Sequence, residues 1–175
     1  MTEGARQMHP GLQFISYLFS YPAVQAEGHS VPGISGTDSD ALLDEIKGID
    51  HILLENEYVR LFINAMPEVP CPPYGSVYLE GSVMGESTLK VAEIYRKYGV
   101  ASEEPADHIA VETEFLAWLH GRAAADGDAR QDFTYLLGHL RQWTEPFFSK
   151  VAEHDQLGCF RHSAETARRV LATLE

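Results

Sequence analysis

The sequence predicts an all-α protein, a single compact helical bundle of six or more helices. Apolar residues recur at intervals of three and four along most of the chain, which is the spacing of helices that bury one face. No run of alternating β-branched residues indicates a strand. The chain has 175 residues, of which 45% are hydrophobic, so it can bury a substantial core. We expect one domain over residues 1–175.

The N-terminal helical part, residues 1–63, is expected to contain three helices. Pro10 suits the first turn of the first helix, because an N–H is not needed there. Asp38 or Asp40 can begin a second helix, and Asp50 can cap a third. The third helix has an amphipathic stripe at Leu54, Tyr58, Leu61 and Phe62, which we expect to lie in the core.

A proline-rich connector, residues 64–84, separates the two helical parts. Four of the nine prolines of the chain lie in its first 13 residues. Pro72 and Pro73 do not fit inside a helix and favour an extended backbone. We therefore expect a rigid strap between the two halves of the bundle.

The C-terminal helical part, residues 85–175, is expected to hold the remaining helices. Gly99 can end the first of them in a left-handed conformation, and Pro105 can open the next. Pro146 removes one backbone hydrogen bond from a long helix and is expected to kink or split it. The last helix follows Gly158.

The helix expected over residues 105–119 has two polar residues within its apolar stripe. His108 and Glu112 lie four residues apart and so share one face of this helix. They either satisfy each other as a buried pair or line a site. Asp107 is a candidate cap for the start of the same helix.

The net charge of −13 disfavours nucleic acids and anionic membrane surfaces as partners and favours basic ones. Most of the excess lies in the first two thirds of the chain, and no lysine or arginine occurs between Lys97 and Arg122. The acidic stretch is either a solvated face or a surface for a cation. No segment has the pattern of a signal peptide or the length of a membrane span, and Cys71 and Cys159 suggest no disulfide framework. We expect a cytoplasmic protein.

Motifs for metal binding or catalysis are missing. The eight histidines include no Glu-x-x-His and no His-Glu-x-x-His pattern, so we expect no metal and no bound cofactor. No nucleophile is paired with a base by any recognisable motif, and no glycine-rich phosphate loop occurs. Peptide binding uses more of what is unusual, namely a helical scaffold, an acidic stretch, and a strap that ends in Tyr74, Ser76 and Tyr78.

These residues carry a resemblance to a known family. The sequence strongly resembles the TorD/DmsD family of redox-enzyme maturation chaperones, also called twin-arginine proofreading chaperones, over most of the chain from about Glu55. The matching segments are PPYGSVYLEG (72–81), GESTLKVAEIYRKYGV (85–100), EPADHIAVETEFLAWL (104–119), ENEYVRLF (55–62) and WTEPFFSKVAEH (143–154). The glycine at position 75 resembles the DmsD branch more closely, although Tyr74 replaces the tryptophan of that branch.

The resemblance implies an all-helical cytoplasmic chaperone without catalytic activity. Such chaperones bind the precursor of a molybdopterin oxidoreductase of the dimethyl-sulfoxide-reductase type, through its twin-arginine signal peptide, its mature part, or both. They assist cofactor loading before export, and they are monomers or domain-swapped homodimers. Two alternatives stay open: an assembly factor for a molybdoenzyme that is not exported, as in the related NarJ branch, and a metal-dependent helical enzyme.

The resemblance also implies where the signal peptide binds. The residues it assigns to this site are Tyr74, Gly75, Ser76, Tyr78, Gly99, Asp107 and His108, with Glu112 supporting His108 from behind. The strap and the start of the 105–119 helix are about 30 residues apart in sequence. We expect these two segments to converge on one groove.

Overall fold

The computed structural model describes residues 8–22 and 37–174. In these ranges the chain forms eight α-helices and one π-helical segment, without a β-strand, and this confirms the predicted fold class. The elements are α1 (Pro10–Phe19), α3 (Thr37–Gly48), α4 (His51–Tyr58), the π-helical η1 (Val59–Ile63), α5 (Gly75–Glu80), α6 (Glu86–Lys97), α7 (Ile109–Ala123), α8 (Gly127–His154) and α9 (Cys159–Thr173).

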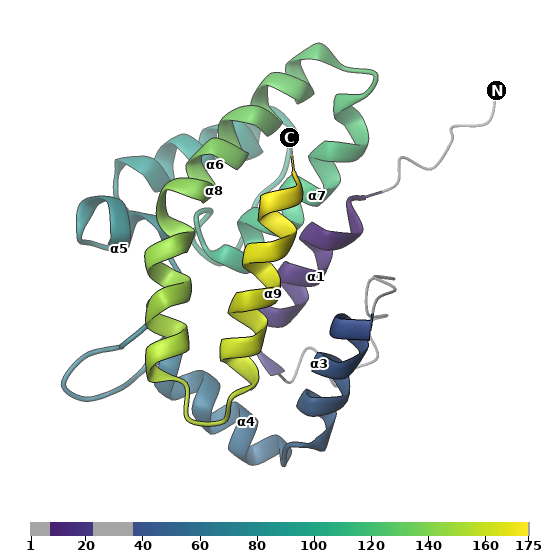
Figure 1. Ribbon diagram of the computed structural model, residues 1–175. Helices are drawn as coiled ribbons and strands as arrows, with labels where there is room; N and C mark the ends of the chain where they lie inside the picture. The colour runs from purple at the N-terminus through teal and green to yellow at the C-terminus, as the bar shows by residue number, and fades with distance from the viewer. Residues whose placement is uncertain (1–7, 23–36, 175) are drawn as a thin grey trace.

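Helices α1, α7, α8 and α9 form the centre of the bundle. Helix α7 packs against both α1 and α8, and α9 packs against α8, α1 and α3 (Figure 1). Large side chains fill the space between these helices because burying them removes the most apolar surface from water. The largest fully buried ones include Phe14, Phe19, Trp143, Phe147 and Phe148.

Several helix ends follow the predicted local chemistry. Pro10 is the first residue of α1, as expected. Asp50 caps α4, since its Oδ1 accepts hydrogen bonds from the backbone N–H groups of the second and third helical residues at 3.0 and 3.2 Å. Gly99 follows the end of α6 with φ +71, the left-handed conformation that glycine adopts without strain.

Two elements differ from the prediction. The connector is not extended throughout, because residues 75–80 form the short helix α5. The long helix α8 passes through Pro146 without splitting, although Figure 1 shows that it bends part-way along. Trp143 and Phe147, on either side of Pro146, are fully buried, and their packing holds the helix together across the lost hydrogen bond.

Candidate functional site

The strap and the start of α7 are joined by backbone pairing. Tyr74 and His108 form an isolated antiparallel bridge, and the N–H of Ile109 donates to the carbonyl of Pro73 at 2.9 Å. The rings of Tyr74 and His108 meet edge to face, with their centroids 5.3 Å apart. The two segments therefore converge, as their proposed joint role requires.

Asp107 is buried at this junction and caps a helix other than the one expected. Its Oδ2 accepts a hydrogen bond of 2.7 Å from the backbone N–H of Ser76, in the first turn of α5. Its carbonyl accepts from the N–H of Gly75 at 3.0 Å. Asp107, Gly75 and Ser76 are all buried, so they hold the strap in place rather than form its exposed surface.

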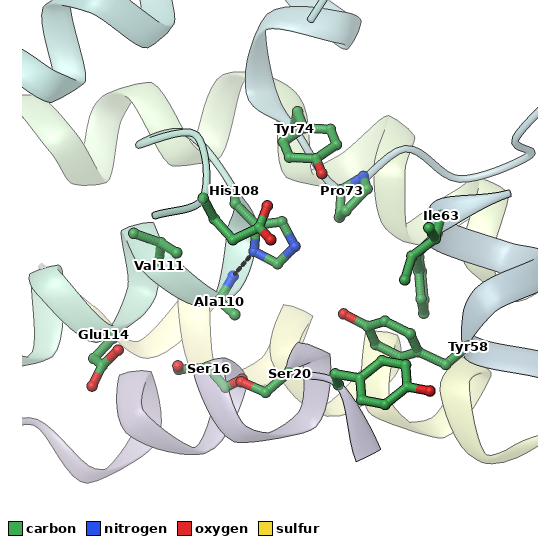
Figure 2. A pocket seen from close by; sticks show the side chains of 13 residues that line it. Ser16, Ser20, Tyr58, Ile63, Pro73, Tyr74, His108, Ala110, Val111 and Glu114 are labelled. Carbon is green, nitrogen blue, oxygen red and sulfur yellow. Dashed lines mark hydrogen bonds between the residues drawn. The ribbon is translucent and has the colours of Figure 1, made fainter. Parts of the chain in front are cut away.

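His108, and not Asp107, caps α7. Pairing with the strap keeps the backbone of His108 extended (φ −67, ψ 133), so the helix begins at Ile109 instead of Pro105. The His108 Nδ1 accepts from the N–H of Ala110 at 3.2 Å. Burial lowers the pKa of His108 to about 4, so the ring is neutral at pH 7. Because Nδ1 is an acceptor, Nε2 carries the hydrogen, and Figure 2 shows that nitrogen facing the cavity.

A cavity of about 400 Å³ opens beside the bridge (Figure 2). It combines aromatic walls with two exposed carboxylates, Glu104 and Glu114, and none of the described residues around it is a lysine or arginine. Burial raises the pKa of Tyr74, and the nearby Glu104 raises it further. The lining residues are Ser16, Ser20, Tyr21, Tyr58, Phe62, Ile63, Pro73, Tyr74, Glu104, His108, Ala110, Val111 and Glu114.

Glu112 has a partner other than the one considered from the sequence. Its Oε1 lies 2.7 Å from Nδ1 of His139 in α8, and both side chains are buried. Burial raises the pKa of Glu112. Burial also disfavours the charged form of His139, but the hydrogen bond and charge of Glu112 outweigh it, so the pKa of His139 is raised. The pair of His108 and Glu112 is thus wrong, and Glu112 fixes α7 to α8.

Two further residues assigned by resemblance lie outside the cavity wall. Tyr78 stacks on Trp143 with a centroid distance of 5.8 Å, and the ammonium of Lys150 lies 5.7 Å from its ring centroid. Gly99 is exposed in the turn after α6. Neither residue lines the cavity beside the bridge.

The sequence did not single out four of the residues that line this cavity. Tyr58 and Phe62 were expected in the core, and they are indeed 4% and 3% exposed, yet both also line the cavity. Glu104 and Glu114 belong to the acidic stretch that lacks basic residues. That charge pattern was the available signal for them, but only the folded chain places both around one space.

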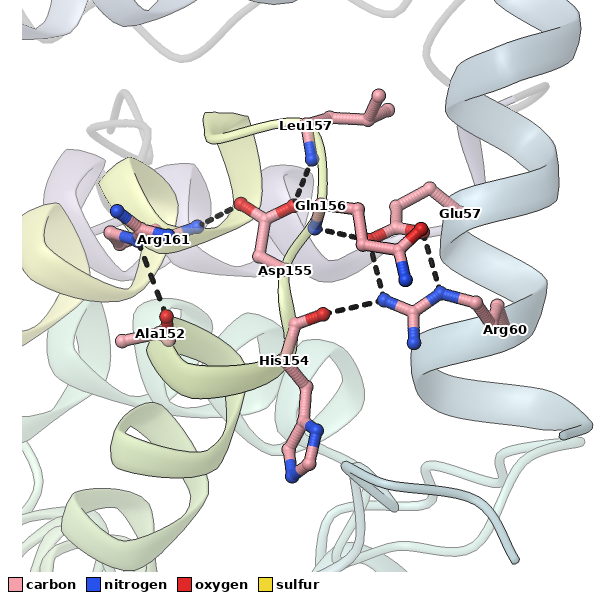
Figure 3. A network of polar contacts seen from close by, with 8 residues as sticks. All are labelled: Glu57, Arg60, Ala152, His154, Asp155, Gln156, Leu157 and Arg161. Carbon is pink, nitrogen blue, oxygen red and sulfur yellow. Dashed lines mark hydrogen bonds and ion pairs between the residues drawn. The ribbon is translucent and has the colours of Figure 1, made fainter. Parts of the chain in front are cut away.

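A second polar cluster ties α4 and η1 to the turn between α8 and α9 (Figure 3). The buried Glu57 pairs with Arg60 through two hydrogen bonds of 2.7 Å and accepts from the N–H of Gln156, also at 2.7 Å. Asp155 accepts from the N–H of Arg161 at 2.8 Å, in the first turn of α9. Each of these hydrogen bonds joins two parts of the fold, so the cluster is structural.

Over residues 8–22 and 37–174, no three His, Cys, Asp or Glu side chains are grouped so that they could hold a metal ion. In the same ranges no helix is both long enough and apolar enough to cross a membrane.

Comparison with known proteins places the chain among relatives. A family model described as nitrate reductase delta subunit matches residues 36–149. A crystal structure described as a redox enzyme maturation protein from Archaeoglobus fulgidus is 32% identical, with a TM-score of 0.66, and the match covers 99% of this chain and 97% of that one. The chain belongs to the family of the nitrate reductase delta subunit and the TorD and DmsD chaperones.

The curated relatives in this family are named as chaperones. The chaperone protein TorD of Vibrio cholerae is 29% identical over 54% of this chain and 49% of its own length. The Tat proofreading chaperone DmsD of Haemophilus influenzae is 28% identical over 61% of this chain and 52% of its own. The chain thus spans about half the length of the curated relatives it matches. Because the two match almost equally, the expected closeness to the DmsD branch stays a prediction.

Proposed function

We propose that this family member is a cytoplasmic maturation chaperone that binds the precursor of a redox enzyme before export. Its client is a molybdopterin oxidoreductase of the dimethyl-sulfoxide-reductase type, recognised through its twin-arginine leader, its mature part, or both. The observation that carries the proposal is the acidic and aromatic cavity beside the bridge between Tyr74 and His108. The names of the TorD and DmsD relatives support it.

The cavity has the chemistry to hold a peptide that combines basic and apolar residues. Glu104 and Glu114 attract an arginine, and no described basic residue in the lining opposes it. The Nε2–H of His108 can donate to a peptide carbonyl, and Tyr74 offers a half-buried ring for apolar contact. A leader that becomes ordered on binding loses conformational entropy, so we expect modest affinity.

Calorimetric titration with synthetic leader peptides tests the proposal. Peptides from redox enzyme precursors of the same genome should bind, and replacing both arginines of the leader with glutamine should weaken binding. Affinity should also fall with added salt, because exposed carboxylates are screened. Failure of every leader and every molybdoenzyme precursor to bind would overturn the proposal.

Matched charge variants place the binding in the cavity. Glu104→Gln and Glu114→Gln should each lower leader affinity by roughly three- to tenfold, the range expected of one partly screened ion pair. Glu165→Gln on α9 removes the same charge from an exposed position outside the cavity and should leave affinity almost unchanged. Equal effects of all three variants would show that only the net charge matters.

The family model favours one second candidate, a NarJ-like assembly factor for a molybdoenzyme that is not exported. The two functions differ in the client. Binding of a mature molybdoenzyme subunit, together with no binding of any leader, would support the assembly factor. Light scattering of the purified protein would decide between a monomer and a domain-swapped homodimer.

A further inference from the structure

A second cavity lies along α7 next to the first. It has a volume of about 480 Å³. The two cavities share Val111 and Glu114, so they are neighbours along one side of the helix. From Ala110 in the first cavity to Trp118 in the second, the helix rises about 12 Å. A bound peptide would cover this distance with about four extended residues.

The walls of the second cavity are mainly apolar. Tyr95, Phe115 and Trp118 contribute to them, and the rings of Tyr95 and Phe115 lie 4.1 Å apart. The Tyr95 hydroxyl donates to the carbonyl of Ala106 at 2.8 Å, so this donor is already used within the protein. The segment after Gly99 supplies another wall through Val100. The cavity therefore offers carbon surface rather than polar partners.

Charge along α7 gives the two cavities a direction. Glu104 lies at the first cavity, and Glu114 lies between the two. At the far end of the second cavity, the Arg122 guanidinium lies over the Trp118 ring, 4.1 Å from its centroid. A cationic side chain is attracted to the carboxylates and repelled by Arg122. A peptide with basic residues at one end and apolar residues at the other thus fits in one orientation.

We propose that the second cavity binds the apolar segment of the same leader whose arginines lie at the first cavity. This inference rests on the proposed function, and it adds a location and an orientation for the apolar part of the ligand. The shared Val111 and Glu114 make the path between the two cavities continuous. Burying apolar side chains of the leader there adds affinity that the ion pairs alone do not supply.

Tryptophan fluorescence can test this directly. The chain has two tryptophans: Trp143 is fully buried, whereas Trp118 is half-buried at the second cavity. Quenching by acrylamide therefore reports mainly on Trp118. A complete leader peptide should protect Trp118 from quenching, and a peptide shortened to the segment around the two arginines should not.

An exposed position in the lining provides the matching variant. Ala101 is exposed, so Ala101→Glu should fold, and it places a carboxylate beside the apolar wall. We expect about a tenfold loss of affinity for the complete leader, the cost of burying roughly two fewer apolar groups, and no loss for the shortened one. Since an added negative charge attracts the arginines, long-range electrostatics would act in the opposite direction. Ala172→Glu, exposed on α9, is the control.

The outcomes separate this inference from the proposed function. If the complete leader binds without protecting Trp118, and Ala101→Glu binds it like the unmodified protein, the second cavity is not the site of the apolar segment and the proposed function stands. If calorimetry detects no leader binding at all, the proposed function fails, and this inference fails with it.

Discussion

The carboxylate of Asp107 accepts a hydrogen bond of 2.7 Å from the backbone N–H of Ser76, 31 residues earlier in the chain. This single contact caps α5 from the loop that precedes α7. The strap thereby acquires a fixed position against α7, and Tyr74 is held beside His108. Asp107 acts on the candidate site by shaping it, since its own side chain is fully buried.

Replacing Asp107 should lower stability before it affects any ligand. Asp107→Ala leaves the buried N–H of Ser76 without an acceptor, and we expect a loss of about 1–2 kcal/mol in the free energy of unfolding. Asp107→Asn keeps an oxygen at this position and should lose less. Urea unfolding followed by circular dichroism measures both. Equal stability of the alanine variant and the unmodified protein would contradict the capping role.

His108 can be tested apart from its capping role. Asparagine is a good N-cap, so His108→Asn should preserve the start of α7 while it removes the Nε2–H donor from the cavity. We expect leader affinity to fall about five- to tenfold, the value of one hydrogen bond. Calorimetric titration measures the affinity, and unchanged thermal stability serves as the control. Full affinity in a stable variant would remove His108 from the site.

The lowered pKa of His108 predicts a loss of stability on acidification. The folded value is about 4 and the ordinary value is 6.5, so between these pH values the unfolded chain binds a proton that the folded chain does not. Stability is therefore present above pH 6.5 and decreases as the pH falls toward 4. We expect His108 to contribute about 1.5 kcal/mol of loss from pH 6.5 to pH 5. Comparing urea unfolding of the protein and of His108→Asn at both pH values isolates this contribution.

The pair of Glu112 and His139 should act in the opposite direction. Both pKa values are raised, so the folded chain binds more protons than the unfolded chain. Their contribution from His139 is present below pH 6.5 and is lost as the pH rises through the folded pKa. Glu112→Gln keeps a hydrogen-bond acceptor without the charge, so its stability should decline less between pH 6.5 and pH 8.5. A decline as steep as in the unmodified protein would contradict this account.

Gly75 should not tolerate a side chain. A Cβ at this position would lie 2.8 Å from Nε1 of Trp143 and 3.1 Å from Cε1 of His139. Trp143 is fully buried and has no space into which to move, so Gly75→Ala should cost about 1–3 kcal/mol of stability. Gly138→Ala, within α8, meets no atom within 4 Å and should be neutral or stabilising. Thermal unfolding of the two variants compares them directly.

Local chemistry made much of the fold predictable. Pro10, Asp50 and Gly99 act on the backbone within a few residues of themselves, and each begins, caps or follows the end of a helix as expected. The start of α7 could not be placed in the same way. Its position depends on pairing between His108 and Tyr74, which the spacing of apolar residues does not reveal. Residues 23–36, where the sequence suggests a loop, lie outside the described part of the chain.

The sequence by itself determined the helical class, the acidic stretch and the family resemblance, because periodicity, charge and motifs are properties of the chain in order. The tertiary structure decided which polar groups meet. It paired Glu112 with His139 rather than His108, and it gathered Glu104, Glu114 and Tyr74 around one cavity. Partners of this kind come from different helices, and their contacts are set by how the buried faces pack, which no local pattern encodes.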